Sequence, residues 1–106
     1  MTNSREKGKR GERELAGVLR QHGYETHRGA QYKGGPQSPD VEGLPHIHIE
    51  CKRVERLDIY AAIDQSRRDA QGSGDLPAVF HRKNNCDWLV TMRLEDWMRL
   101  YKGEEL

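Results

Sequence analysis

The feature that most constrains the fold is a run of seven residues, 46–52, in which polar and apolar side chains alternate strictly. Alternation with a period of two is typical of a β-strand, because successive side chains of an extended chain point to opposite sides. The two faces would be Ile47, Ile49 and Cys51 on one side, and His46, His48, Glu50 and Lys52 on the other. The run therefore predicts a strand with one apolar face and one face that presents a carboxylate beside an ammonium group.

Other elements are expected before this strand. Apolar residues at helical spacing begin at Leu15 and stop before Gly23, a plausible C-terminal cap, so they predict a helix of about three turns. Residues 24–28 are readable as a short edge strand, and the Gly-rich stretch 29–38 indicates a loop. A second short strand should then lead into a turn at 42–45.

The second half of the chain continues the alternation of helices and strands. Asp58 is suited to cap a helix that ends near Gly72 and carries one apolar face. Residues 78–82 and 88–92 have the pattern of hairpin strands, and an amphipathic helix from Leu94 onward closes the chain. The order α-β-β-β-α-β-β-α predicts an α/β (α+β) fold, one domain over the whole chain, with helices around a mixed sheet.

The composition is that of a small folded domain. Hydrophobic residues make up 34% and charged residues 33% of the chain, and the net charge is only +1. A chain of 106 residues has a modest core, which dimerisation would stabilise further. No apolar run approaches the ~20 residues needed to cross a bilayer. We expect a cytoplasmic protein in which Cys51 and Cys86 remain free thiols.

Three residues on and near the alternating strand suggest a phosphodiesterase site. Glu50 and Lys52 share a face, and a hairpin turn at 42–45 could bring the carboxylate of Asp40 beside Glu50. Two carboxylates at close range repel, and a hard cation such as Mg²⁺ relieves the repulsion while keeping waters for a substrate phosphate. The backbone carbonyl of Cys51 could be a further ligand, and Lys52 could neutralise the charge that grows on the phosphate.

A simpler interpretation of the same residues remains open at this point. Glu50 and Lys52 could form an exposed pair worth under ~1 kcal/mol, with Asp40 in an ordinary turn. Glu12 is similarly ambiguous, because it lies one turn before Leu15 on the apolar side of the first helix. Either the apolar stripe begins at Leu15 and Glu12 is solvated, or Glu12 is buried beside a cation.

A resemblance to a known family joins these observations. Pro39-Asp40 followed by Glu50-Cys51-Lys52 resembles the signature of the PD-(D/E)XK nucleases. The stretch from Lys7 to Leu15, a Lys-Gly pair followed by Glu-Arg-Glu-Leu, is similar to the opening helix of archaeal and phage Holliday junction resolvases. The resemblance covers roughly residues 5–70, and nothing specific is recognised beyond residue 72.

The resemblance implies a restriction-endonuclease-like fold and a catalytic set of Glu12, Asp40, Glu50 and Lys52, with Glu12 approaching the metal through water. It also implies Mg²⁺ as cofactor, for which Mn²⁺ could substitute, and no organic cofactor. The expected activity is symmetric nicking of four-way DNA junctions by a homodimer, in recombination and repair. A phage or prophage origin fits this family, so the expected location is the host cytoplasm.

Shape-selective binding of branched DNA needs mainly phosphate contacts. The residues expected to supply them are Lys7, Lys9, Arg10, Arg28, Lys33, Ser38 and Arg53. Of these, Arg28 and Ser38 rest on the resemblance, which also implies that Arg28 leads into a mobile loop. Gln65 resembles a Gln of the virus-type replication-repair nucleases, which keeps a flap or nicking nuclease as an alternative.

Three other interpretations of these residues are disfavoured. A zinc site would draw on His46, His48, Cys51, His81 and Cys86, but their spacing is unusual and Cys51 should lie on the opposite strand face from the first two. Such His residues more often lie exposed beside a DNA path. A catalytically inactive DNA-binding module of the same fold is disfavoured because every signature position is filled. A sequence-specific restriction enzyme would need more chain than this for reading bases.

Overall fold

The computed structural model describes residues 4–29 and 38–106, with side chains from Glu6 onward, and confirms the predicted order of elements. Most of the expected loop at 29–38, with Lys33, lies outside the described residues. The helices and strands are α1 (Ser4–Gln21), β1 (His27–Arg28), β2 (Val41–Glu42), β3 (Ile47–Arg53), α2 (Ile59–Ala70), β4 (Leu76–Arg82), β5 (Leu89–Thr91) and α3 (Leu94–Tyr101). None of these helices is long and apolar enough to cross a membrane.

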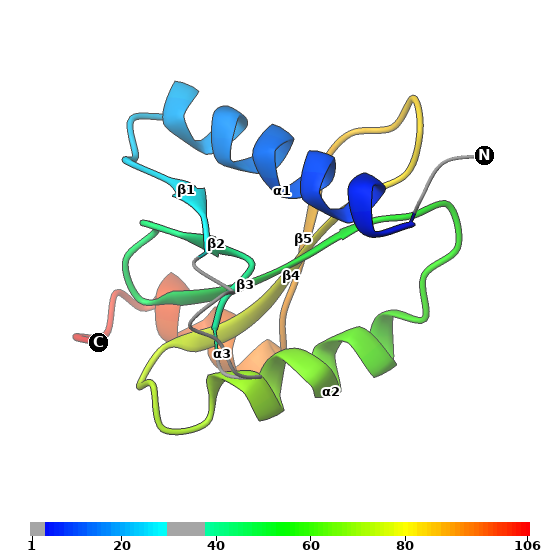
Figure 1. Cartoon of the computed structure of the whole chain (residues 1–106). Helices are drawn as coiled ribbons and strands as arrows, with labels where there is room; N and C mark the ends of the chain where they lie inside the picture. The colour runs from blue at the N-terminus through cyan, green and yellow to red at the C-terminus, as the bar shows by residue number, and fades with distance from the viewer. Residues whose placement is uncertain (1–3, 30–37) are drawn as a thin grey trace.

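The strands form one mixed sheet of five, in the order β1-β2-β3-β4-β5. Pairing is antiparallel except between β3 and β4, which run parallel because the chain returns through α2. In Figure 1, α1 lies on one side of the sheet and α2 on the other. The central strand β3 is therefore covered on both faces, as is usual for a parallel pair flanked by helices.

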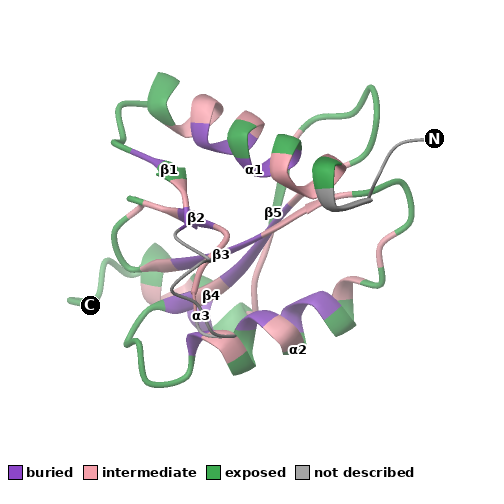
Figure 2. Cartoon of the chain, viewed as in Figure 1, coloured by how far each residue is buried: buried purple, intermediate pink, exposed green. Residues whose placement is uncertain are grey.

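Two clusters of apolar side chains hold these layers together. On the α1 side, Leu15 packs with Ile49 and Phe80, and on the α2 side Ile63 packs with Val79. Figure 2 shows buried residues along the central strands and on the helix sides that face them. The core is small, and each face of the sheet depends on one helix for its cover.

Helix α1 is longer than predicted, because it begins at Ser4 rather than one turn before Leu15. The added residues include Lys, Glu and Arg, which are good helix formers although they give no apolar signal. Gly11 lies where the helix crosses β3, and a Cβ there would come within 2.5 Å of the Arg53 Cβ. The helix ends as expected, with Gly23 in the left-handed region at φ 99°.

The polar face of the alternating strand is not a solvent face. Only 2% of His48 and 3% of Glu50 is exposed, because α2 packs over that side of β3. His46 lies outside the strand at φ 72° and is exposed. The expectation that these His residues lie exposed beside a DNA path is therefore wrong for His48.

The elements after β3 follow the prediction closely. Asp58 caps α2 by accepting a hydrogen bond from the Ala61 N–H at 3.1 Å. The expected apolar face of α2 is buried, and β4 and β5 form the expected hairpin. Helix α3 also forms, but Leu94 and Tyr101 of its apolar stripe are exposed, and Asp96 is its buried side chain.

Candidate active site

The short hairpin of β2 and β3 brings Asp40 beside Glu50. Val41 pairs with Ile49, so the residue before Val41 lies opposite the residue after Ile49. The Asp40 N–H donates to the Ile49 carbonyl at 2.9 Å, and the Cys51 N–H donates to Asp40 Oδ2 at 2.8 Å. These two bonds fix the Asp40 carboxylate at the edge of β3.

Gly29 supports Asp40 from the other side. Its N–H donates to the Asp40 carbonyl at 2.8 Å. A Cβ at position 29 would lie 2.0 Å from the Pro39 carbonyl oxygen, so only glycine allows the two backbones to approach this closely. The chain after β1 is thereby locked against the segment that carries the acidic residue.

Lys52 is held between two groups. Its Nζ lies 3.2 Å from Glu50 Oε1 and donates to Gln65 Oε1 at 3.3 Å. The ammonium is thus shared between the polar face of β3 and helix α2. A Lys held from two sides loses less side-chain entropy when it engages a phosphate or a water than a free surface Lys would.

The two carboxylates are electrostatically strained. Burial, and then the charge of Glu50, raise the pKa of Asp40 from 3.8 to about 7, although the Cys51 N–H bond opposes the rise. Burial also raises the pKa of Glu50, against the opposing effect of Lys52. Two desolvated carboxylates, one of which raises the pKa of the other, favour either a shared proton or a bound cation.

Asp69 belongs to the same electrostatic environment and was missed in the sequence. Its charge contributes to the raised pKa of Glu50. It lies four residues after Gln65 on α2, and residues at that spacing share a helix face. The signal that could have found Asp69 was this spacing from Gln65, once Gln65 was known to face Lys52.

Glu12 is buried, with 9% of the residue exposed. Arg28 Nε donates to Glu12 Oε1 at 2.8 Å, so the cation beside this carboxylate is a guanidinium from β1. The interpretation that Glu12 is solvated is therefore wrong. Its charge also raises the pKa of Asp40 and Glu50, which indicates that Glu12 lies near both.

The chemistry of the donor set fits Mg²⁺ better than zinc. Among residues 4–29 and 38–106, no three His, Cys, Asp or Glu side chains lie together as a ready metal cage. Mg²⁺ does not need one, since it commonly uses one or two carboxylates and keeps its waters. Burial raises the pKa of the Cys51 thiol, which disfavours the thiolate that zinc requires. His81 instead bonds Thr91 Oγ1 at 2.9 Å.

The residues expected to contact DNA lie in different parts of the structure. Lys7 and Arg10 of α1 line a groove with Arg53 and Asn84, and Lys9 lies on the same part of α1. Arg28 is already paired with Glu12, as described above. Ser38 is half-buried two residues before Asp40.

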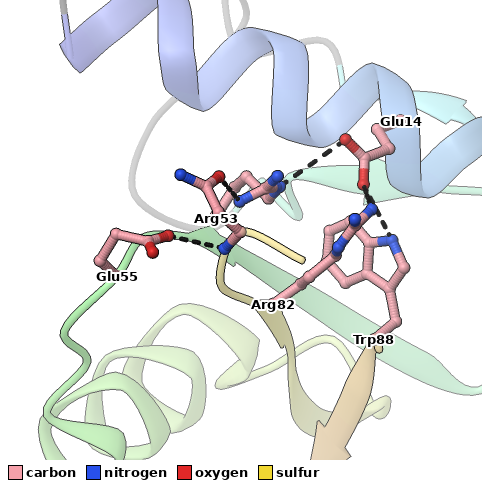
Figure 3. A network of polar contacts seen from close by, with 6 residues as sticks. Glu14, Arg53, Glu55, Arg82 and Trp88 are labelled. Atoms are coloured by element: carbon pink, nitrogen blue, oxygen red, sulfur yellow. Dashed lines mark hydrogen bonds and ion pairs between the residues drawn. The ribbon is translucent and has the colours of Figure 1, made fainter. Parts of the chain in front are cut away.

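Arg53 belongs to a network centred on Glu14 (Figure 3). Glu14 Oε2 lies 3.7 Å from Arg53 Nε, and Glu14 Oε1 accepts from Trp88 Nε1 at 3.1 Å and from Arg82 Nη1. Arg53 Nη1 also donates to Asn84 Oδ1 at 3.0 Å. The network joins α1, β3, β4 and the loop before β5, and sequence reasoning did not find it.

Comparison with known proteins supports the fold. A solved structure with a similar fold is that of Hjc from Archaeoglobus fulgidus, described as a Holliday junction resolvase from an archaeal hyperthermophile. The TM-score is 0.61 at 24% sequence identity, over 81% of this chain and 72% of that one. No curated protein matches the sequence.

The mixed sheet between α1 and α2, which carries Glu50 and Lys52 on its central strand and Asp40 beside it, has the restriction-endonuclease-like fold. Residues 3–104 match the family described as phage putative PDDEXK endonuclease. The chain belongs to this family.

Proposed function

We propose that this chain is a metal-dependent DNA endonuclease that cuts branched DNA, and four-way junctions above all. The observation that carries the proposal is the placement of the half-buried Asp40 opposite the buried Glu50, beside a Lys52 that contacts both Glu50 and Gln65. The raised pKa values of both carboxylates are those of a site prepared for a divalent cation. Membership of an endonuclease family supports the hydrolysis of phosphodiester bonds.

Each residue of the site has a separate role in this proposal. Asp40, Glu50 and the Cys51 carbonyl would hold Mg²⁺, or Mn²⁺ in its place, which when bound supplies Lewis-acid stabilisation of the phosphate and a water of lowered pKa. Lys52 would neutralise charge at the phosphate or orient the attacking water, and Gln65 keeps its ammonium in place. Glu12 would approach the metal through water, and its carboxylate is oriented by the hydrogen bond from Arg28.

Branched DNA is the favoured substrate because the solved structure of similar fold is described as a Holliday junction resolvase. The groove lined by Lys7, Arg10 and Arg53 can contact backbone phosphates whatever the sequence. Lys9, Arg28, Lys33 and Ser38 remain candidates for the same role. Symmetric incision needs two catalytic centres, so we propose a homodimer that acts in recombination or repair of phage DNA in the host cytoplasm.

A second candidate is a flap or nicking nuclease of the virus-type replication-repair class. The contact between Lys52 and Gln65 favours it, since Gln65 resembles a Gln of that class. The two candidates share a mechanism and differ in the DNA that they cut. A catalytically inactive DNA-binding module is the third possibility, and the filled site argues against it.

The test is cleavage of an end-labelled four-way junction, beside matched duplex, flap and single-strand substrates, with Mg²⁺ or with EDTA. Paired symmetric nicks on the junction alone, with Mg²⁺ alone, are expected. Asp40→Asn, Glu50→Gln and Lys52→Ala should abolish cutting and leave junction binding largely intact. Asp64→Asn is the matched control, because this side chain on α2 is 63% exposed.

Each outcome has a distinct meaning. Cutting of flaps in preference to junctions would favour the second candidate. Binding without cutting by the unaltered protein, at any divalent ion, would leave the inactive module. Full activity in Asp40→Asn, Glu50→Gln or Lys52→Ala would overturn the assigned site.

A further inference from the structure

Helix α3 packs on the rest of the chain in the reverse of the usual amphipathic arrangement. Its Asp96 is only 4% exposed and accepts hydrogen bonds from the Arg93 guanidinium, whereas Leu94 and Tyr101 are 70% and 67% exposed. Trp97 stacks on Tyr101 with ring centroids 4.9 Å apart, yet 48% of Trp97 is exposed. An apolar stripe that faces solvent is the mark of an interaction surface.

The exposed stripe continues onto helix α2. A groove whose walls include Tyr60 and Ile63 of α2 on one side, and Met92 and Leu94 on the other, joins the two helices. Tyr60 is 82% exposed on its wall of the groove. We call the following set the C-terminal apolar surface: Tyr60, Leu94, Trp97, Leu100 and Tyr101.

The size of this surface matches what one partner contributes to a dimer. The exposed fractions of the five side chains range from 40% to 82%. With roughly 150–250 Å² per large side chain, they leave on the order of 600 Å² of apolar area, against about 800 Å² per partner in a standard interface. Edge strand β5 adds to the need for cover, since Leu89 and Val90 are both more than half exposed.

We propose that the C-terminal apolar surface binds the same surface of a second copy of this chain. This choice of occupant rests on the proposed function, because symmetric incision of a junction needs two catalytic centres and one chain carries one. The charge of this segment disfavours DNA as the occupant, since residues 94–106 hold four acidic side chains against two basic ones.

The experiment is sedimentation velocity on the full chain across a concentration series, without DNA. The variants are Trp97→Glu and Tyr101→Glu, which place a charge at the centre of the surface. The matched control is Tyr24→Glu, because Tyr24 is an aromatic residue of similar exposure, 45%, that follows α1. Circular dichroism checks the fold of each protein.

We expect the unaltered chain and Tyr24→Glu to sediment as dimers, and both α3 variants to dissociate with a Kd raised about 30-fold or more. Emission from Trp97 should move to shorter wavelength as the unaltered chain dimerises. If the unaltered chain stays monomeric up to about 100 μM, the proposal is overturned, and another protein would have to cover the C-terminal apolar surface. Dimers that persist in both α3 variants would overturn it as well.

These outcomes separate the interface from the nuclease proposal. A dimer that dissociates on Trp97→Glu but cuts no DNA would retain the interface and reject the nuclease. A monomer that cuts DNA would do the opposite. If both proposals hold, Trp97→Glu should convert paired nicks into single, uncoupled nicks without removing metal-dependent cutting.

Discussion

Replacing Asp40 by Asn should stabilise the metal-free protein, which is the opposite of what most substitutions at a half-buried polar site do. Asn is nearly isosteric, and its side-chain oxygen can still accept the hydrogen bond from the Cys51 N–H. It removes a charge that burial and Glu50 disfavour, as the pKa of about 7 for Asp40 records. The substitution therefore removes electrostatic strain and keeps the hydrogen bond.

The size of this effect follows from the pKa of Asp40. A rise from 3.8 to about 7 corresponds to about 4 kcal/mol against the ionised folded state. Water around a half-buried carboxylate and a proton shared with Glu50 reduce this to about 2 kcal/mol. Because the folded pKa is raised, the unfolded state loses its proton first, and the penalty grows as pH rises from about 4 to about 7.

Urea denaturation at pH 5 and at pH 8, with EDTA, measures this prediction. Asp40→Asn should raise the free energy of unfolding by about 2 kcal/mol at pH 8 and by less than half as much at pH 5. Asp64→Asn should show no such dependence, since its side chain is exposed. Mg²⁺ should stabilise the unaltered protein at pH 8 and have little effect on Asp40→Asn.

Two results would refute the reasoning. A loss of stability in Asp40→Asn at pH 8 would mean that the carboxylate stabilises the fold without a cation. An equal gain at both pH values would mean that the effect does not come from ionisation.

Three further predictions concern residues around the site. Gln65→Leu should leave Lys52 without its α2 partner and lower the rate of cleavage about 10- to 100-fold, with little change in the CD spectrum. Gly29→Ala should lower the free energy of unfolding by about 1–3 kcal/mol in urea denaturation, because its Cβ meets the Pro39 carbonyl. Arg10→Ala should reduce the slope of log Kd for junction DNA against log salt by about 1, as measured by fluorescence anisotropy, if its groove holds a phosphate.

The parts of the fold that could be predicted from the sequence are those with a local signal. Asp58 predicts the start of α2, because its short side chain can cap only N–H groups that are close in sequence. The alternation of residues 46–52 predicts a strand, and the short turn after Asp40 predicts a hairpin. The same turn brings Asp40 to Glu50, so the centre of the site depends on contacts that are close in sequence.

The parts that could not be predicted depend on contacts between distant segments. Glu14 contacts Arg82 and Trp88 from the other end of the chain, and nothing near any of the three indicates the others. The extension of α1 to Ser4 has the same origin, because its residues are charged and give no apolar period. The helix propensity of these residues allows the extension, and the close approach of Gly11 to Arg53 sets the position of α1 on β3.

Periodicity shows how side chains divide between two faces, but it does not show what covers each face. On β3 the polar face was expected to meet solvent or DNA, and α2 covers it, so His48 and Glu50 are buried. On α3 the predicted amphipathic helix forms, but most of its apolar side chains meet solvent. Both differences have one cause. The polarity of a side chain reflects all of its contacts, and these include contacts with ligands and with other proteins. In the functions proposed above, a cation would offset the charge of the buried Glu50, and a second protein surface would cover the exposed Trp97.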